Sequence, residues 1–452
     1  MKEQQEELNL EGLMKELKNE GFIPQQGIVG HAVIFESVDN SYFPNCFDNN
    51  ADARYVVTNI PPPPGEKNLL PIQEGESALF RMRPDEAIIL LGTTPPECEY
   101  FSITPYIYER YFEKDLRFHE VFNSLHDPKN NMTLKTSGPD KPFNAFTVII
   151  FSPDRGIKNK VLQCLINAGY DVKAINLSRI PSSVLRMGVD FENDIMMCLY
   201  RFYGPANEEL LVDYYDEIGI NLKVLRVTPE SPLKPDELDP YGMPNLRVRG
   251  TGITEMDLMP VMEKLRQSIL DNYEKLGWKA TEYTTDQWLE EGLQALQANK
   301  NMFGENRDVA YMCTKSFTMY DNEFIVIYGV NHTQTEKAAY CSAVVYGKEY
   351  YNGVKGSNSM PENNWKGSAD EYLPGEGSAD NFFVLTACRD NPQPLENPSF
   401  VVPTNIDTQG VQKYKPIFVG FRNYLEKATK SGPIPEEMIS PRVIKFSKPM
   451  YP

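Results

Sequence analysis

The strongest constraint in this sequence lies between residues 143 and 229, where segments with strand period alternate with segments with helix period. The order is strand, helix, strand, strand, helix, strand, over residues 146–151, 157–168, 172–177, 195–202, 207–218 and 222–227. A βαββαβ order of this kind is typical of a ferredoxin-like split unit, or of part of a larger open α/β sheet. We therefore expect a mixed α/β protein of the α+β type, with this unit at its centre.

The regions on either side of this unit differ in kind and divide the chain into three expected domains. Residues 1–135 contain short runs of β-like alternation and predict a β-rich N-terminal lobe with a leading helix. Residues 136–250 hold the βαββαβ unit, and residues 251–452 mix helical and strand patterns. The C-terminal lobe is therefore expected to be α+β.

Two helices and one long loop are expected in the C-terminal lobe. Residues 255–276 carry an apolar stripe at helical spacing, and a second helix over 286–298 is indicated because Thr284 and Gln287 are spaced as a capping box. Residues 351–380 are rich in Gly, Ser, Asn and Asp. A segment of that composition predicts a long loop, which is often a lid or a binding loop.

The charge balance of the chain argues against whole classes of partner. Against 63 Asp and Glu residues stand 45 Lys and Arg residues, so the formal net charge is −18. Most of the surface should repel phosphate backbones and anionic lipids, and we expect no nucleic-acid or membrane-surface binding. The longest apolar runs are about six residues, against roughly 20 for a membrane-spanning helix, so no transmembrane segment is expected.

The N-terminus and the cysteines bear on where the protein resides. Residues 1–21 lack the apolar centre of a secretory signal and are too acidic for a transit peptide. We expect a cytoplasmic protein, or a secreted one if a leader has been removed. The seven cysteines never form a CxxC pair, and most of them are expected to be buried thiols. No HExxH or HxH motif supports a metal site, and the sequence does not identify a cofactor.

Residues 246–254, LRVRGTGIT, are the best candidate for an anion site. Two glycines let the backbone approach a ligand just before an expected helix N-terminus, where free N–H groups favour negative charge. The arginines could complete a clamp for a carboxylate or a phosphate. The candidate ligand-binding residues are Arg247, Arg249, Gly250 and Thr251. The alternative is an ordinary turn and cap, in which Arg249 pairs with Glu255.

His332 and Glu255 are the first candidates for acid–base chemistry. His332 stands in the turn that follows an expected strand over 324–328, a position from which side chains are often delivered to a site. Glu255 directly follows the anion-site candidate, and a glutamate is among the side chains that serve as general acid or base. The alternative is a structural histidine that is hydrogen-bonded or exposed.

Residues 100–110 alternate strictly between two kinds of side chain. One face of the expected strand is apolar, and the other carries tyrosines, of which Tyr106 and Tyr108 could stack on a sugar or an aromatic ligand. The alternative is that this face packs beneath a helix or a loop.

Taken together, these signals favour one functional hypothesis and leave a second open. The first is a soluble enzyme or ligand-binding protein that acts on an anionic small molecule at a site between lobes. The second is a non-catalytic interaction or structural protein, which uses its acidic surface and residues 351–380 to contact a protein partner.

Overall fold

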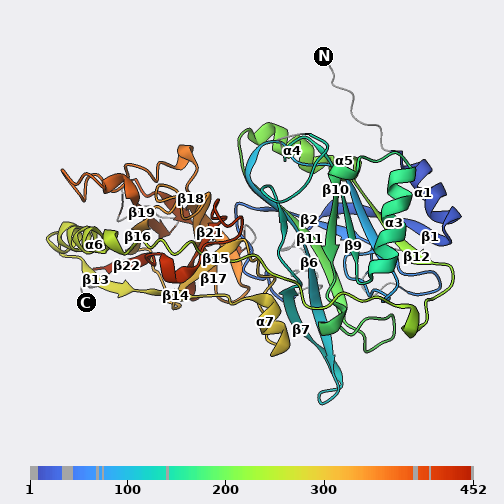
Figure 1. Cartoon of the computed structure of the whole chain (residues 1–452). Coiled ribbons are helices and arrows are strands. Elements are labelled where there is room, and N and C mark those ends of the chain that lie inside the picture. The colour runs from blue at the N-terminus through green and yellow to red at the C-terminus, as the bar shows by residue number, and fades with distance from the viewer. Residues whose placement is uncertain are drawn as a thin grey trace. The chain divides into compact units, whose positions relative to one another are not determined.

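The computed structural model describes residues 9–32, 44–67, 71–73, 76–138, 142–389, 395, 397–406 and 409–448. The chain divides into two compact units. The first comprises residues 1–32, 54–246 and 291–306, and the second comprises residues 33–53, 247–290 and 307–452. Mixed helices and strands in both units confirm the expected α+β class (Figure 1).

The first unit is built on one curled open sheet, which has ten strands among the described residues. The strand order is β10 (Ile175–Arg179), β9 (Phe146–Ser152), β5 (Ala87–Thr93), β12 (Leu222–Pro229), β1 (Phe22–His31), β2 (Arg54–Asn59), β11 (Ile195–Pro205), β6 (Cys98–Phe112) and β7 (Arg117–Ser124), with β8 (Lys129–Asn130) paired to β6. β9 and β10 are parallel, and the other pairs are antiparallel. β3 (Pro71–Gln73) pairs antiparallel with β4 (Glu76–Ser77).

The strands of the expected βαββαβ unit are β9 to β12, and they belong to this larger sheet. β5 lies between β9 and β12, and β1 and β2 lie between β12 and β11. Of the two topologies left open by the sequence, the structure therefore shows the larger open sheet. The expected first and second domains both contribute strands to this sheet. One of the divisions between the two compact units follows Leu246, close to the expected end of the second domain.

Strand β1 produces the curl of the sheet, because its two halves pair with different neighbours. Its residues from Phe22 to Gly27 pair with β12, and those from Ile28 to His31 pair with β2. Gly27 stands at the change of partner, where an added Cβ would lie 2.2 Å from the carbonyl oxygen of Asn59. A side chain at this position would push the two strands apart.

Helices cover both faces of the first sheet. α1 (Leu10–Asn19) and α3 (Arg155–Asn167) pack on one face through aliphatic side chains that include Leu13, Leu17 and Val161. α4 (Glu208–Asp216) and α5 (Ile218–Asn221) pack on the other face, and α7 (Gly292–Gln297) joins the same core through Leu296. Apolar burial on both faces explains why the central strands read as continuous apolar runs.

The second unit is a sandwich of two five-stranded sheets among the described residues. One has the order β13 (Lys279–Tyr283), β22 (Arg442–Ser447), β16 (Glu323–Val330), β19 (Phe382–Arg389), β20 (Phe400–Val402). The other has the order β14 (Thr285–Gln287), β15 (Val309–Thr314), β21 (Ile417–Tyr424), β17 (Tyr340–Gly347), β18 (Asn352–Asn358). Aliphatic and aromatic side chains from both sheets form the core between them.

Each outer face of the sandwich has its own cover. α6 (Met259–Glu274) packs on the first sheet through Met262, Leu265 and Ile269, which confirms the helix expected within 255–276. Trp288 packs on the outer face of the second sheet. The second helix expected over 286–298 is confirmed only for Gly292–Gln297, because the first residues of that range form β14.

The segment 351–380 is more ordered than a long loop. It contains β18, and its apolar side chains Ala369, Tyr372 and Leu373 are buried against the first sheet of the sandwich. The Trp365 ring stacks on Phe383 with 4.2 Å between ring centroids. The sequence analysis predicted a loop because the few apolar side chains of this segment stand among many polar ones.

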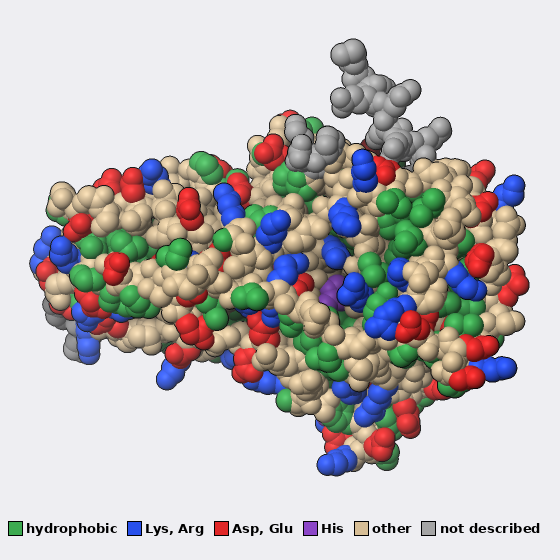
Figure 2. Space-filling model, viewed as in Figure 1, with side chains coloured by type: hydrophobic (Ala, Val, Ile, Leu, Met, Phe, Trp, Pro, Cys, Tyr) green, Lys and Arg blue, Asp and Glu red, His purple; other side chains and the backbone are tan. Residues whose placement is uncertain are grey.

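The surface matches the composition. On the face shown in Figure 2, acidic and basic side chains intermingle, so the negative net charge does not gather in one patch there. Among the described residues, every helix is too short or too polar to span a lipid bilayer.

Candidate functional site

The candidate anion segment, residues 246–254, has no regular secondary structure, and its arginine side chains bind other parts of the second unit. Arg247 Nη2 donates to Asp308 Oδ1 at 2.8 Å, and the Asp308 side chain is fully buried. Arg249 donates to backbone carbonyls, with Nη2 at 2.7 Å from the oxygen of Pro433 and 2.9 Å from that of Val309. The structure thus shows both expected clamp residues bound to groups of the chain itself.

The turn at Gly250 and Gly252 does hold a carboxylate, and that carboxylate is the side chain of Glu437. The N–H of Thr251 donates to Glu437 Oε2 at 3.0 Å, and the N–H of Gly252 donates to Oε1 at 2.6 Å. Both glycines have positive φ, and a Cβ on Gly250 would lie 2.5 Å from Ile434 Cγ2. The sequence predicted an external anion at this turn, and in the structure the side chain of Glu437, far along the chain, binds the backbone N–H groups there.

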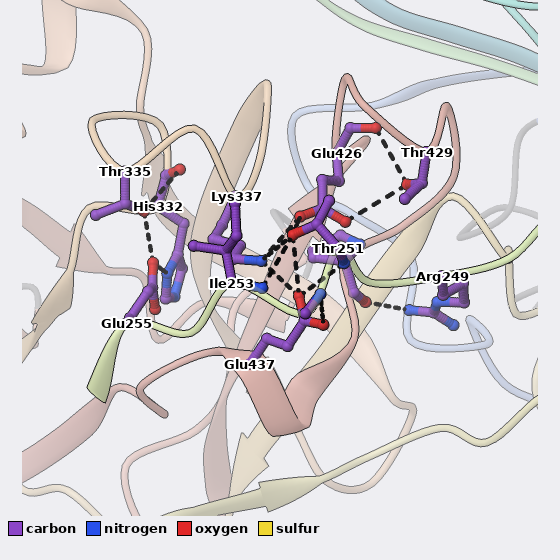
Figure 3. Close-up of polar contacts among 12 residues, drawn as sticks. Arg249, Thr251, Ile253, Glu255, His332, Thr335, Lys337, Glu426, Thr429 and Glu437 are labelled. Atoms are coloured by element: carbon purple, nitrogen blue, oxygen red, sulfur yellow. Dashed lines mark hydrogen bonds and ion pairs between the residues drawn. The ribbon is translucent and has the colours of Figure 1, made fainter. Parts of the chain in front are cut away.

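Lys337 completes this cluster (Figure 3). Its Nζ donates to Glu437 Oε2 at 2.5 Å, to Glu426 Oε1 at 2.9 Å and to Thr251 Oγ1 at 3.0 Å. Burial would raise the pKa of Glu437, but the hydrogen bonds from Lys337, Thr251 and Gly252 outweigh it and lower that pKa to about 2. Glu437 is thus an ionised, fully engaged internal ligand of the turn.

His332 and Glu255, predicted separately as acid–base candidates, are in direct contact at the other end of the segment. His332 Nδ1 lies 2.8 Å from Glu255 Oε1, and both side chains are 3% exposed. Thr335 Oγ1 donates to the same carboxylate oxygen at 2.5 Å, and the N–H of Ile439 donates to Oε2 at 2.8 Å. Burial would raise the pKa of Glu255, but the charge of His332 and these hydrogen bonds outweigh it and lower the pKa.

This contact determines which nitrogen of His332 is free to react. An ionised carboxylate only accepts hydrogen bonds, so the proton of the ring must sit on Nδ1. The opposite nitrogen, Nε2, is buried and has no hydrogen-bond partner among the described residues. A buried polar atom without a partner costs free energy, and in native structures it calls for an explanation such as a bound ligand.

Cys341 lies close to this pair but is poorly suited to act as a nucleophile. Its thiol is fully buried and interacts with the backbone N–H groups of His332 and Thr333. Burial, and secondarily the charge of Glu255, raise the pKa of Cys341 well above its ordinary value. The thiol therefore stays protonated, and a protonated thiol is a weak nucleophile.

The two candidate tyrosines lie in the first unit, on β6, and both are buried. Tyr106 Oη accepts a hydrogen bond from Arg201 Nη2 at 2.7 Å, and Tyr108 Oη donates to Glu120 Oε1 at 3.1 Å. The Phe122 ring packs edge-on against both tyrosines. Packing thus covers the polar-aromatic face that the alternation predicted.

One further pair escaped the sequence analysis. In the first unit, His126 Nε2 lies 2.6 Å from Ser178 Oγ, and His126 Nδ1 lies 2.6 Å from the carbonyl oxygen of Asp127. Both residues are buried, and no local pattern links positions so far apart in the chain. In the part of the chain that the structure describes, no group of three or more His, Cys, Asp and Glu could hold a metal ion.

Comparisons with known proteins add no functional assignment. No family model and no curated protein matches the sequence. An uncharacterised protein from Burkholderia cenocepacia is similar over 97% of this chain and 87% of its own, with 9% identity and a TM-score of 0.41. The VPA0106 protein from Vibrio parahaemolyticus is similar over 97% of this chain and all of its own (100%), with 11% identity and a TM-score of 0.37. Likenesses of this degree carry no argument about function.

Proposed function

We propose that the second unit is a ligand-binding, acid–base centre in which His332 Nε2 exchanges a proton or a hydrogen bond with a small molecule. The observation that carries this proposal is the buried Nε2 without a partner among the described residues, opposite an Nδ1 that Glu255 holds in place. A carboxylate that orients a histidine in this way stabilises its protonated form, which is the arrangement used in general-base catalysis.

The ligand that suits this centre is a small molecule with an anionic or strongly polarised oxygen. When His332 is protonated, its Nε2–H is a charged donor, and Glu255 balances the positive ring. Arg247 and Arg249 contribute to anchoring the chain, since their guanidinium groups bind Asp308 and backbone carbonyls. Anion recognition at this centre would therefore rest on His332.

The reaction class that fits is proton transfer without a covalent enzyme intermediate. The neighbouring thiol of Cys341 is held protonated by burial, and the hydroxyl of Thr335 is engaged with Glu255. Neither group is activated as a nucleophile. The competing hypothesis of an interaction protein is weakened because the apolar side chains of segment 351–380 face the interior.

Ring-nitrogen NMR tests this proposal directly, because the chain has only four histidines. In ¹⁵N-labelled protein, the His332 Nε2 signal should shift in a saturable way when one class of small anion is added, with formate, acetate, lactate and inorganic phosphate as probes.

Variants separate this role from a purely structural one. His332→Gln should abolish the saturable response, and Glu255→Gln should weaken it, because the charge that fixes the Nδ1 proton is lost. His119→Gln is the matched control, since His119 pairs with an exposed Asp115 in the first unit. A His332 Nε2 signal that no probe shifts, in protein with native circular dichroism, would assign the pair to structure alone.

A further inference from the structure

A cavity of about 400 Å³ lies in the first unit, away from the centre proposed above. It is enclosed by the proline-rich segment that follows β2, by residues 79–81, and by the loop around Phe191. Its volume falls within the range of small-molecule sites, roughly 300–1,000 Å³. Proline, Phe80 and Phe191 side chains give it apolar walls, and Phe191 is 66% exposed.

Two arginines line this cavity, and they differ in function. Arg226 is fully buried and paired with Glu86 at 2.7 Å. Its Nε donates to the carbonyl oxygen of Pro61 at 2.7 Å and its Nη2 to that of Arg81 at 2.9 Å. Arg226 is therefore a positioning residue, which holds the wall and Arg81 in place with its charge already neutralised.

Of the two arginines, Arg81 is the one whose charge remains for a ligand; Lys67 also lines the cavity, but its side chain is exposed to solvent. Arg81 Nη2 donates to the carbonyl oxygen of Phe191 at 2.7 Å and Arg81 Nε to that of Asn193 at 3.3 Å. These two bonds use Nε and Nη2, and Nη1 takes part in neither of them. Burial lowers the pKa of Arg81, although Glu66 and Asp190 raise it. The carbonyl oxygens fix the guanidinium plane without cancelling its charge, which prepares it for a carboxylate.

We infer that this cavity binds a small amphiphilic carboxylate, with the carboxylate on Arg81 and the apolar body against Phe80, Phe191 and the prolines. Glu66 lines the same cavity and interacts electrostatically with Arg81. It competes with the ligand for the guanidinium, so its charge opposes binding. Removal of the Arg81 charge should therefore weaken carboxylate binding, and removal of the Glu66 charge should strengthen it.

Calorimetric titration with 3-phenylpropionate, and with 3-phenylpropanamide as its neutral analogue, tests the inference. The acid should bind at least tenfold more tightly than the amide in the wild-type protein. Arg81→Gln should remove that preference, Arg81→Lys should retain part of it, and Glu66→Gln should strengthen binding of the acid several-fold. Arg179→Gln is the matched control, because Arg179 lies over the Tyr241 ring in the same unit and outside the cavity.

Three results of the titration would contradict the proposed carboxylate site. Equal binding of acid and amide, or an Arg81→Gln protein that folds and binds the acid unchanged, would overturn the inference. So would the lack of saturable binding in the wild-type protein. If Arg81→Gln fails to fold, Glu66→Gln and Arg81→Lys still give the sign of the charge effect. His332→Gln should leave this titration unchanged, so the two proposals can fail independently.

Discussion

At the scale of single residues, the structure separates what local sequence can show from what it cannot. Glu255 and His332 were each chosen as acid–base candidates from the local sequence. In the structure His332 Nδ1 lies 2.8 Å from Glu255 Oε1, although 77 residues separate them. The glycine turn was predicted to bind an external anion, and the structure shows it bound to the chain's own carboxylate of Glu437. Its ligand, Glu437, and the cation Lys337 have no local signature, because only the fold brings them to Thr251.

Glu437→Gln is expected to destabilise the second unit by about 1–3 kcal/mol at pH 7, because charge-assisted bonds to Lys337, Thr251 and Gly252 are weakened. Urea unfolding at pH 7 measures this loss. The native pKa of Glu437 lies near 2, below its unfolded value of about 4.3, so its contribution is present above the unfolded pKa and is lost as the pH falls toward 2. The gap between variant and wild type should be smaller at pH 3.5.

Glu436→Gln is the matched control for that experiment, because Glu436 is adjacent and exposed. Its effect should stay within about 0.5 kcal/mol, as for most surface substitutions. Equal losses for the two variants at pH 7 would show that the turn does not depend on the Glu437 carboxylate.

At the scale of secondary-structure elements, periodicity was a good guide where burial is simple. Central strands such as β9 and β12 read as apolar runs because helices cover both of their faces. The first residues of the helix expected over 286–298 are not helical, because Trp288 reaches the outer face of the second sheet and packs on Tyr346 and Phe418. A capping-box pattern is a local preference, and this tertiary packing overrides it.

The packing of Trp288 requires a glycine beneath it. A Cβ on Gly420 would lie 2.5 Å from Trp288 Cζ3 and 2.8 Å from Tyr346 Cε2. Gly420→Ala should therefore destabilise the second unit by about 1–3 kcal/mol through overpacking, as measured by urea unfolding. Gly377→Ala is the matched control, because its Cβ would meet nothing within 4 Å. A Gly420→Ala protein as stable as this control would mean that Trp288 does not lie on the sheet.

At the scale of the whole molecule, the chain crosses between its two compact units more than once. Residues 33–53 belong to the second unit, although β1 and β2 on either side of them belong to the first. Residues 291–306 belong to the first unit, although both of their flanks belong to the second. No change in composition marks these crossings, so the three consecutive domains expected from the sequence could not reveal them.

Asp48, in the first of these crossings, offers a test that is specific to one unit. Its carboxylate is buried beside Arg422, Lys348 and the Trp288 side chain, all in the second unit. Burial raises the pKa of Asp48 to about 7, although Arg422 and Lys348 lower it. The native state therefore binds this proton more tightly than the unfolded chain, whose Asp pKa is about 3.9.

Because of that difference, stability should fall as the pH rises from about 4 to 7 and then stay level. Asp48→Asn removes the ionisation and should stabilise the second unit above pH 7 by up to about 4 kcal/mol, with little effect near pH 4. Asn also tolerates the positive φ at this position. Hydrogen exchange at pH 5 and pH 8 would locate the gain, which we expect in the second unit alone. Asp286→Asn, an exposed change in the same unit, should follow the wild-type pH profile, and an Asp48→Asn profile parallel to it would contradict a neutral Asp48.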